Sequence, residues 1–367
     1  MGSALTRSID ELASEHSLPT AAYEQLIAGR TPALEAYAAS RAVEARKRVY
    51  SNAVFIRGLI EISNHCKNDC HYCGIRASNA GCERYRLSPD QIVECADRGY
   101  GLGFRTFVLQ GGEDGWFTDE RLSSIIGRIK SAHPDCAVTL SLGERGKESF
   151  AKLRRAGAER YLLRHETATR AHYELLHPDA MSFDDRLRCI DDLRALGYAV
   201  GIGFMVGSPY QTSAHLAADL KLVERFAPEM CGIGPFVPHH ATRFADWNGG
   251  TIELTCFLLS LLRLIQPNLL MPATTALGTI APDGRERGIL AGANVVMPNL
   301  SPAEVRGKYE LYDNKSHTDA EAAENVADLR KRMGSIGYEI VVDRGDPHED
   351  GMRPDGHRPR AASGEGM

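Results

Sequence analysis

Residues 54–73 read VFIRGLIEISNHCKNDCHYC, an apolar run followed at once by three closely spaced cysteines. The run from Val54 to Ile62 is rich in β-branched residues and predicts a buried strand. Cys66, Cys70 and Cys73 therefore fall on the loop that leaves the carboxyl end of this strand. Active sites of α/β barrels lie at that end of the strands.

The cysteines have the spacing C-x3-C-x2-C, which favours a 4Fe-4S cluster. A cluster used only for electron transfer usually has four cysteine ligands, so three leave one iron open. An open position distinguishes catalytic from structural metal sites. Zinc held with His65 or His71, and inert thiols, are the alternatives. A zinc module would bring a second Cys/His pair, whereas the nearby Cys82 has no partner.

The composition is that of an ordinary globular protein with one large or two smaller domains. The chain has 367 residues, of which 25% are charged and 43% hydrophobic, and its net charge is −5. This charge offers no attraction to nucleic acid or an anionic membrane. No apolar run approaches the roughly 18 residues of a membrane span. Nine cysteines, mostly isolated, are typical of a reducing compartment. We therefore expect a cytoplasmic protein without nucleic-acid or membrane partners.

From residue 54 onward, strand patterns alternate with amphipathic helix patterns. This alternation indicates parallel β/α units, and the count favours a (β/α)8 TIM-type barrel, with a doubly wound open sheet as the alternative. The expected strands are 54–62, 105–110, 136–142, 160–165, 198–206, 230–236, 269–275 and 293–297. The expected helices lie near 88–101, 118–131, 147–156, 168–176, 182–196, 212–226, 251–265 and 301–312.

The chain divides into three parts on the same patterns. Residues 1–50 predict an N-terminal helical extension, with helices near 8–16, 20–28 and 31–50. Residues 51–342 predict the barrel. Residues 343–367 are polar, rich in glycine and proline and aperiodic, which predicts a disordered tail.

Polar residues follow several of the expected strands at their carboxyl ends. Gly111 and Gly112 can bring backbone close to a ligand because glycine has no Cβ. Arg164 and Glu166 are two apart on a strand and hence on one face. A guanidinium can bind a carboxylate through two hydrogen bonds, and a carboxylate can hold a ribose or an ammonium group. The sequence therefore predicts a ligand site at the mouth of the barrel.

Beyond these local arguments, the motif C-x3-C-H-Y-C resembles the cluster motif of the radical S-adenosylmethionine (SAM) superfamily. Longer blocks resemble the HydE family of FeFe-hydrogenase maturases over roughly residues 30–340. These blocks are Tyr85-Arg86, 108–114 (VLQGGED), 138–144 (VTLSLGE), 160–167 (RYLLRHET), 232–236 (GIGPF), 272–276 (PATTA) and 292–299 (GANVVMPN).

The resemblance implies one 4Fe-4S cluster and SAM at the top of a closed barrel. SAM is then cleaved to methionine and a 5′-deoxyadenosyl radical, which acts on a cysteine-bound Fe(CO)2CN unit made by a partner maturase. Other hydrogenase maturases and a reductant protein are the implied partners. Some members of the family carry a second cluster near the C-terminus, but no cysteine follows Cys256 here. The segment 238–243 (PHHATR) also differs from the proline-rich loop of the family.

The resemblance also assigns residues to roles. The cluster ligands are Cys66, Cys70 and Cys73. The residues implied to bind SAM are Tyr72, Gly111, Gly112, Glu113, Ser141, Glu166 and Arg186. The residues implied to line the central, catalytic cavity are Gln110, Arg164, Thr274, Thr275, Met297, Tyr309 and Tyr312. Thr274 and Thr275 could instead cap the following helix, and Tyr309 and Tyr312 could pack on one helix face.

Three other functions stay open from the sequence. A lysine mutase that makes methylornithine shares the architecture. A biotin-synthase-like sulfur inserter needs a second cluster, which the isolated later cysteines do not obviously provide. A scaffold that only carries a metallocluster would not cleave SAM at all.

Replacing Cys70 with alanine should abolish reductive SAM cleavage, because the cluster would lose one of its three protein ligands. The measurement is 5′-deoxyadenosine formed anaerobically with reductant. An isolated cysteine, Cys256, provides the control, since its alanine variant should keep the activity. A Cys70→Ala protein that still made 5′-deoxyadenosine would contradict the ligand assignment.

Overall fold

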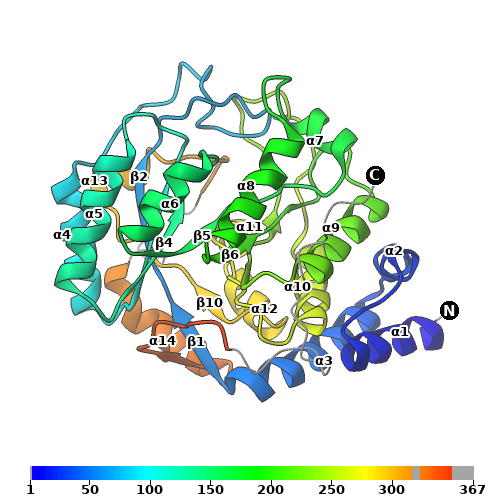
Figure 1. Ribbon diagram of the computed structural model, residues 1–367. Helices are drawn as coiled ribbons and strands as arrows, with labels where there is room; N and C mark the ends of the chain where they lie inside the picture. Colours follow the sequence, from blue (N-terminus) through cyan, green and yellow to red (C-terminus); the bar gives the residue numbers. More distant parts are fainter. Residues whose placement is uncertain (1, 316–322, 349–367) are drawn as a thin grey trace.

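The computed structural model describes residues 2–315 and 323–348, and its parallel strands form a barrel inside a ring of helices (Figure 1). The strands are β1 Ala53–Ile56, β2 Gly58–Ser63, β3 Thr106–Gly111, β4 Ala137–Ser141, β5 Ala158–Leu162, β6 Ala199–Ile202, β7 Met205–Val206, β8 Met230–Cys231, β9 Gly234–Pro235, β10 Val295–Val296 and β11 Glu339–Val341.

The barrel is closed by short parallel contacts between its neighbouring strands. β2, β3, β4, β5, β6 and β8 pair in that order, and β1 pairs with β10. Single bridges join Met230 to Leu270, Pro272 to Val295, and Leu59 to Asn299. The ring is therefore complete. The predicted TIM-type barrel is confirmed, and the open doubly wound sheet is excluded.

Helices surround this ring and form the N-terminal extension. The extension contains α1 Gly2–Glu15, α2 Thr20–Ala28 and α3 Pro32–Tyr50. The others are α4 Pro89–Gly101, α5 Asp119–Ala132, α6 Lys147–Arg155, α7 Arg170–Leu176, α8 Phe183–Ala195, α9 Ser213–Phe226, α10 Ile252–Ile265, α11 Thr275–Ile280, α12 Gly284–Leu290, α13 Ala303–Arg306 and α14 Val326–Ser335, with a 3-10 turn at Ala323–Asn325. Among the described residues, no helix has both the length and the apolar character to cross a membrane.

Local sequence explains where these helices begin. The Ser88 hydroxyl accepts a hydrogen bond from the Gln91 amide, and the Gln91 side chain accepts one from the Ser88 amide. This reciprocal cap satisfies two amides that a helix start leaves free. Ser182 accepts from the Asp185 amide and Thr31 from the Leu34 amide in the same way.

Several predicted elements are wrong in their extent. The expected strands 54–62, 198–206 and 230–236 are each divided into two shorter strands. The expected strand 269–275 survives only as single bridges at Leu270 and Pro272, since a proline cannot donate to a ladder. The expected helix 301–312 is limited to α13, so Tyr309 and Tyr312 do not share a helix face. The short α11 and α12, together with α14 and β11, were not predicted.

The inside of the barrel changes from apolar to polar along its axis. Near the amino ends of the strands, a cluster that includes Phe55, Met230 and Val295 lies beside the buried Arg57, whose guanidinium is 3.1 Å from Met230 Sδ. Nearer the carboxyl ends, Glu61, Gln110 and Ser141 lie side by side in the register of β2, β3 and β4. The polar mouth therefore rests on a packed apolar floor.

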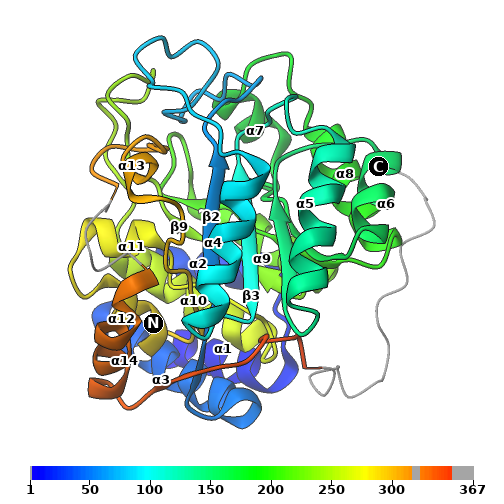
Figure 2. The same ribbon diagram turned by 90° about the vertical axis from the view of Figure 1, so that its left-hand side faces the viewer.

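The two ends of the barrel carry different segments of the chain. In Figure 2 the loop after β2 lies at the top, whereas α1, α3 and α14 lie toward the other end. At that lower end β11 pairs with β1. The predicted disordered tail, 343–367, also begins at this end. Its first residues, 343–348, are ordered and contact the barrel, contrary to the prediction. Residues 349–367 lie outside the described residues. Arg160, only 1% exposed, binds Asp346 at 2.6 Å and the Arg344 carbonyl oxygen at 3.0 Å.

Replacing Asp346 with alanine should lower the free energy of unfolding by about 1–3 kcal/mol, because a buried guanidinium loses its carboxylate partner. Partial burial raises the pKa of Asp346, but hydrogen bonds from Arg344 and Arg160 outweigh it and hold that pKa below 3.8. The stabilisation is thus present at neutral pH and is lost as the pH falls below 3.8.

Chemical denaturation of both proteins across this pH range measures the effect. The control is Asp328→Ala, which removes an exposed pair with Lys331 and should cost about 0.5 kcal/mol or less. Equal losses in the two variants would show that the tail does not stabilise the barrel.

Candidate functional site at the barrel mouth

The loop after β2 brings the three motif cysteines to the mouth of the barrel. Cys66, Cys70 and Cys73 are all partly buried and free of disulfides. Burial raises the pKa of the Cys66 thiol, raises that of Cys73 to about 12, and raises that of Cys70 well above its ordinary value. Thiolates in this setting need a cation to form. The burial of the trio therefore suits a metal centre rather than free reactive thiols.

The spacing of the sulfur atoms distinguishes a cluster from a single ion. In the described part of the chain, one trio of His, Cys, Asp or Glu has ligand atoms that all lie within 4.8 Å of one another, and it is not the cysteine trio. Tetrahedral zinc with Zn–S bonds near 2.3 Å would hold its sulfurs roughly 3.8 Å apart. The cysteine sulfurs are therefore not gathered as closely as a single zinc ion would hold them.

The cysteine loop lies directly against the end of β3. The Gly112 amide donates to the Ser63 carbonyl oxygen at 3.1 Å, and the Lys67 amide donates to the Glu113 carbonyl oxygen at 3.0 Å. The Glu113 amide lies 3.4 Å from Cys66 Sγ. A Cβ at Gly112 would lie 2.3 Å from the His65 carbonyl oxygen and 2.8 Å from Cys66 Cβ. Only glycine allows this approach.

The far end of the loop is tied to the same place. Arg86 binds both carboxylate oxygens of Asp114, at 2.7 and 3.0 Å, and Ser63 also donates to Asp114. Burial raises the pKa of Asp114, but these hydrogen bonds outweigh it and lower the pKa overall. The loop is thus anchored at both ends against one edge of the barrel.

A network of charges connects the expected SAM residues Glu113 and Arg186. The Glu113 carboxylate accepts from the Glu144 amide at 2.9 Å, and its other oxygen lies 3.1 Å from Lys67 Nζ. Arg186 donates to the Glu144 carboxylate at 2.5 Å and to the Arg164 carbonyl oxygen at 2.9 Å. The sequence placed Glu144 only in the block 138–144 after a strand and did not predict that it would be the ion-pair partner of Arg186.

Arg164 and Glu166 form an incompletely satisfied pair that points to a ligand. Arg164 Nη2 and Glu166 Oε2 lie 3.1 Å apart, yet both atoms, and Arg164 Nε, are buried without a well-aligned hydrogen bond. Glu166 also has φ of 66°, which is unusual for a residue with a side chain. Strained backbone and unpaired polar atoms are typical of functional sites.

The expected adenine residue Tyr72 lies on an apolar patch. It packs against Leu176, Met205 and Phe236, and its hydroxyl lies 3.3 Å from His177 Nε2. The electrostatic contacts of Tyr72 and Cys70 include both Glu166 and Arg186. The structure therefore brings the expected cluster and SAM residues together.

Polar residues inside the barrel connect Gln110 to groups that the sequence did not reveal. Tyr309 is 2% exposed and bonds to the Gln110 side chain. Lys315 donates to the Tyr309 carbonyl oxygen at 2.9 Å and pairs with the fully buried Glu61. Asn299 donates to the other Glu61 oxygen at 2.9 Å. Glu61 sits in an apolar strand run, so only the barrel register could have identified it.

The remaining expected cavity residues have different environments. Thr274 occupies the N-cap position of α11, but its hydroxyl makes no capping bond and is buried without a partner. Its capping alternative is therefore wrong. Thr275 is the first residue of α11, and Met297 packs on the apolar floor. Tyr312 is partly buried in the loop after α13.

One trio of possible metal ligands is instead a hydrogen-bonded cluster. His239, His240 and Asp313 lie close together, with His240 Nδ1 2.7 Å from an Asp313 oxygen. The Ala241 amide donates to His239 Nδ1 at 3.0 Å, which leaves the ring proton on Nε2. A metal would need that nitrogen deprotonated. The trio therefore joins the divergent loop 238–243 to the loop that carries Tyr309 and Tyr312.

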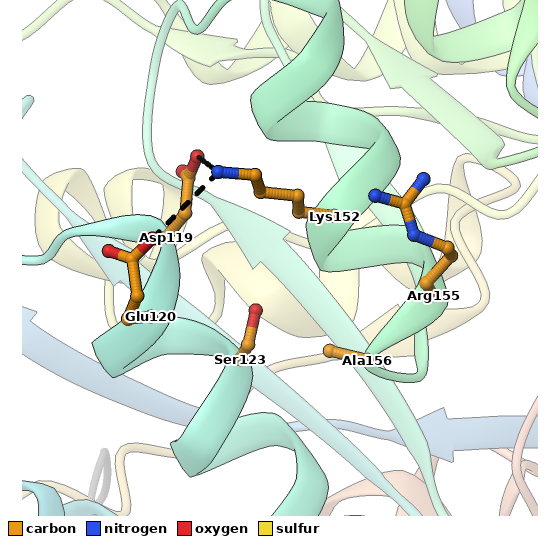
Figure 3. A pocket seen from close by; sticks show the side chains of 6 residues that line it. All are labelled: Asp119, Glu120, Ser123, Lys152, Arg155 and Ala156. Atoms are coloured by element: carbon orange, nitrogen blue, oxygen red, sulfur yellow. Dashed lines mark ion pairs between the residues drawn. The ribbon is translucent and has the colours of Figure 1, made fainter.

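A hollow on the outside of the barrel, between α5 and α6, is lined by Asp119, Glu120, Ser123, Lys152, Arg155 and Ala156 (Figure 3). Lys152 Nζ spans it, 3.6 Å from Asp119 and 3.8 Å from Glu120. These charges neutralise one another, so the hollow offers no comparable ligand site.

Comparison with known proteins agrees with the geometry of the mouth. Residues 60–223 match the model of the radical SAM superfamily. The FeFe hydrogenase maturase subunit HydE of Thermotoga maritima is 45% identical over 272 residues, which cover 74% of this chain and 77% of that protein. The 3-methylornithine synthase of Methanosarcina acetivorans is 28% identical over 299 residues, covering 80% and 82% of the two chains. The crystal structure of a methylornithine synthase aligns with a TM-score of 0.77 at 23% identity and covers 91% of this chain and 97% of its own.

Replacing Gly112 with alanine should cause a severalfold loss of bound iron, because the new methyl group must displace the His65 carbonyl and the Cys66 side chain. Iron and sulfide per chain, after anaerobic reconstitution, measure the effect. Gly115→Ala is the matched control, since no atom lies within 4 Å of a Cβ there. Full cluster content in the Gly112 variant would show that the loop does not depend on this contact.

Proposed function

The chain belongs to the radical SAM superfamily and, within it, to the family of the FeFe hydrogenase maturase subunit HydE, and we propose that it acts in assembly of the hydrogenase two-iron subcluster. The proposed substrate is a cysteine-bound Fe(CO)2CN unit supplied by a partner maturase. The proposed partners also include a reductant protein, and the proposed compartment is the cytoplasm.

The cofactor proposal assigns each group to residues of the mouth. Cys66, Cys70 and Cys73 would hold one 4Fe-4S cluster, which fits their partial burial at the barrel mouth. The cluster, when bound, would pass one electron from the reductant protein to SAM, whose C–S bond would break to give methionine and a 5′-deoxyadenosyl radical. Gly111, Gly112 and Glu113 would meet the methionine part of SAM, and Tyr72 would lie near adenine. The remaining residues proposed to bind SAM are Ser141, Glu166 and Arg186.

The substrate would lie deeper, between the cofactor and the apolar floor. Arg164 Nε is buried without a hydrogen bond, and Arg164 Nη2 has only the poorly aligned ion pair with Glu166 at 3.1 Å, so this guanidinium would also bind the carboxylate of a bound cysteine. Thr274 offers an unpaired hydroxyl from the opposite side of the ring. The other side chains proposed to surround the substrate are those of Gln110, Thr275, Met297, Tyr309 and Tyr312. Burial of these side chains would keep water from the radical.

One observation carries the proposal beyond the superfamily. The barrel mouth that carries the cysteine loop also holds two buried donors without a hydrogen bond, Arg164 Nε and the Thr274 hydroxyl, and both residues lie in sequence blocks that resemble HydE. Unpaired buried donors favour a substrate with acceptor groups, and cysteine supplies a carboxylate.

The test is anaerobic reconstitution followed by SAM cleavage and a maturation assay. The protein with iron, sulfide, reductant and SAM should form 5′-deoxyadenosine, and it should do so without consuming added lysine. With the two partner maturases it should activate an apo-hydrogenase. Lysine consumption would identify a mutase instead, and no SAM cleavage would identify a scaffold.

The Arg164→Gln variant tests the proposed role of Arg164 in substrate binding with the same two assays. This variant should lose hydrogenase activation to a much greater extent than SAM cleavage, because substrate carboxylate binding is lost. The exposed Arg155→Gln should match the wild type in both assays. Normal activation by the Arg164 variant would contradict the proposed substrate position.

A further inference from the structure

The turn after β5 holds Glu166 in a conformation that its own sequence does not favour. Glu166 has φ of 66° and is 7% exposed, and its amide donates to the Gly203 carbonyl oxygen at 3.0 Å. Its buried Oε2 atom lies 3.1 Å from Arg164 Nη2 but has no well-aligned hydrogen bond. A left-handed residue that is not glycine costs about 1–2 kcal/mol, so neighbouring groups must hold it there.

The neighbouring residue His165 supplies one part of this restraint. His165 is fully buried and points away from the mouth, toward α9. The Gly203 amide lies 3.3 Å from His165 Nδ1, and Asp219 Oδ1 lies 3.3 Å from His165 Nε2. Because an amide can only donate, Nδ1 must accept, and the ring proton of neutral His165 must lie on Nε2. That proton is directed to Asp219.

Asp219 supplies the other part, from outside the strand ring. It is fully buried on α9, and the same Oδ1 atom accepts from the Ala168 amide at 2.6 Å. Asp219 Oδ1 therefore contacts both His165, which precedes Glu166, and Ala168, which follows Glu166 by two positions. The second oxygen, Oδ2, is buried and has no hydrogen-bond partner. A fully buried carboxylate is costly unless it is paired and hydrogen-bonded, so the contacts with His165 and the Ala168 amide are what offset this cost.

We propose that Asp219 is a positioning residue for SAM, which acts through His165 and Ala168 to hold the Glu166 carboxylate inside the barrel mouth. The proposal rests on the proposed role of Glu166 in SAM binding. Gly203, the residue after β6, also restrains this turn, because its amide donates to His165 Nδ1 and its carbonyl oxygen accepts from the Glu166 amide. A Cβ at Gly203 would lie 2.0 Å from the Gly232 carbonyl oxygen.

The geometry predicts which substitutions matter. An asparagine in place of Asp219 can keep one carbonyl oxygen at the Oδ1 position, where both donors meet, so Asp219→Asn should change SAM binding only a few-fold. Asp219→Leu removes the acceptor for both donors. It should therefore release the turn and raise the Kd for SAM about tenfold or more, an effect close to that of Glu166→Ala.

The experiment measures the equilibrium Kd for SAM on the anaerobic, cluster-loaded enzyme. Iron and sulfide content should be unchanged in every variant. The double variant Glu166→Ala with Asp219→Leu should bind no more weakly than Glu166→Ala alone, because residues that act through one another are not additive. Val223→Ala, which is fully buried on the same helix, should lower Tm without changing the Kd.

The outcomes separate this inference from the role of Glu166. A normal Kd for Asp219→Leu alongside a raised Kd for Glu166→Ala would overturn the role of Asp219 alone. Additive losses in the double variant would also overturn it, since Asp219 would then act by another route. An unchanged Kd for Glu166→Ala would instead overturn the SAM role of Glu166. If Asp219→Leu does not fold, His165→Asn should raise the Kd severalfold, and an unchanged Kd would contradict the proposal.

Discussion

The contact between the cysteine loop and the end of β3 is the constraint on which the site depends. The Gly112 amide bonds to Ser63, and the missing side chain of Gly112 leaves room for Cys66. The next residue, Glu113, directs its amide toward the Cys66 sulfur. Two loops that are far apart in sequence are thereby fixed at van der Waals distance. The proposed cluster and the proposed SAM site are consequently parts of one rigid unit.

Closure of the barrel places the other side chains around that unit. Because parallel strands all present their carboxyl ends at one mouth, residues from β3, β4, β5 and the segment before α11 converge there. Their polar atoms are only partly paired among themselves, as Arg164, Glu166 and Thr274 demonstrate. Below them, the apolar cluster around Phe55 and Val295 packs in the barrel interior. The arrangement suits chemistry on a bound ligand that must be kept from water.

The sequence predicted the elements with strong periodicity and the residues within recognisable motifs. Strands such as β3 and helices such as α5 follow from apolar patterns alone. The strand at 269–275 failed because Pro272 interrupts its ladder, and the helix at 301–312 failed because contacts with the barrel interior hold Tyr309 in a loop. Partners such as Glu61 with Lys315, and His165 with Asp219, are far apart in sequence. Their pairing depends on strand register and helix packing, which no local pattern encodes.

The most direct test of the account is Mössbauer spectroscopy of the ⁵⁷Fe-reconstituted, oxygen-free protein with and without SAM. The account predicts one 4Fe-4S cluster per chain, in which a single iron changes its signal when SAM is added. Four equivalent iron sites that ignore SAM, or a site filled by zinc, would contradict it.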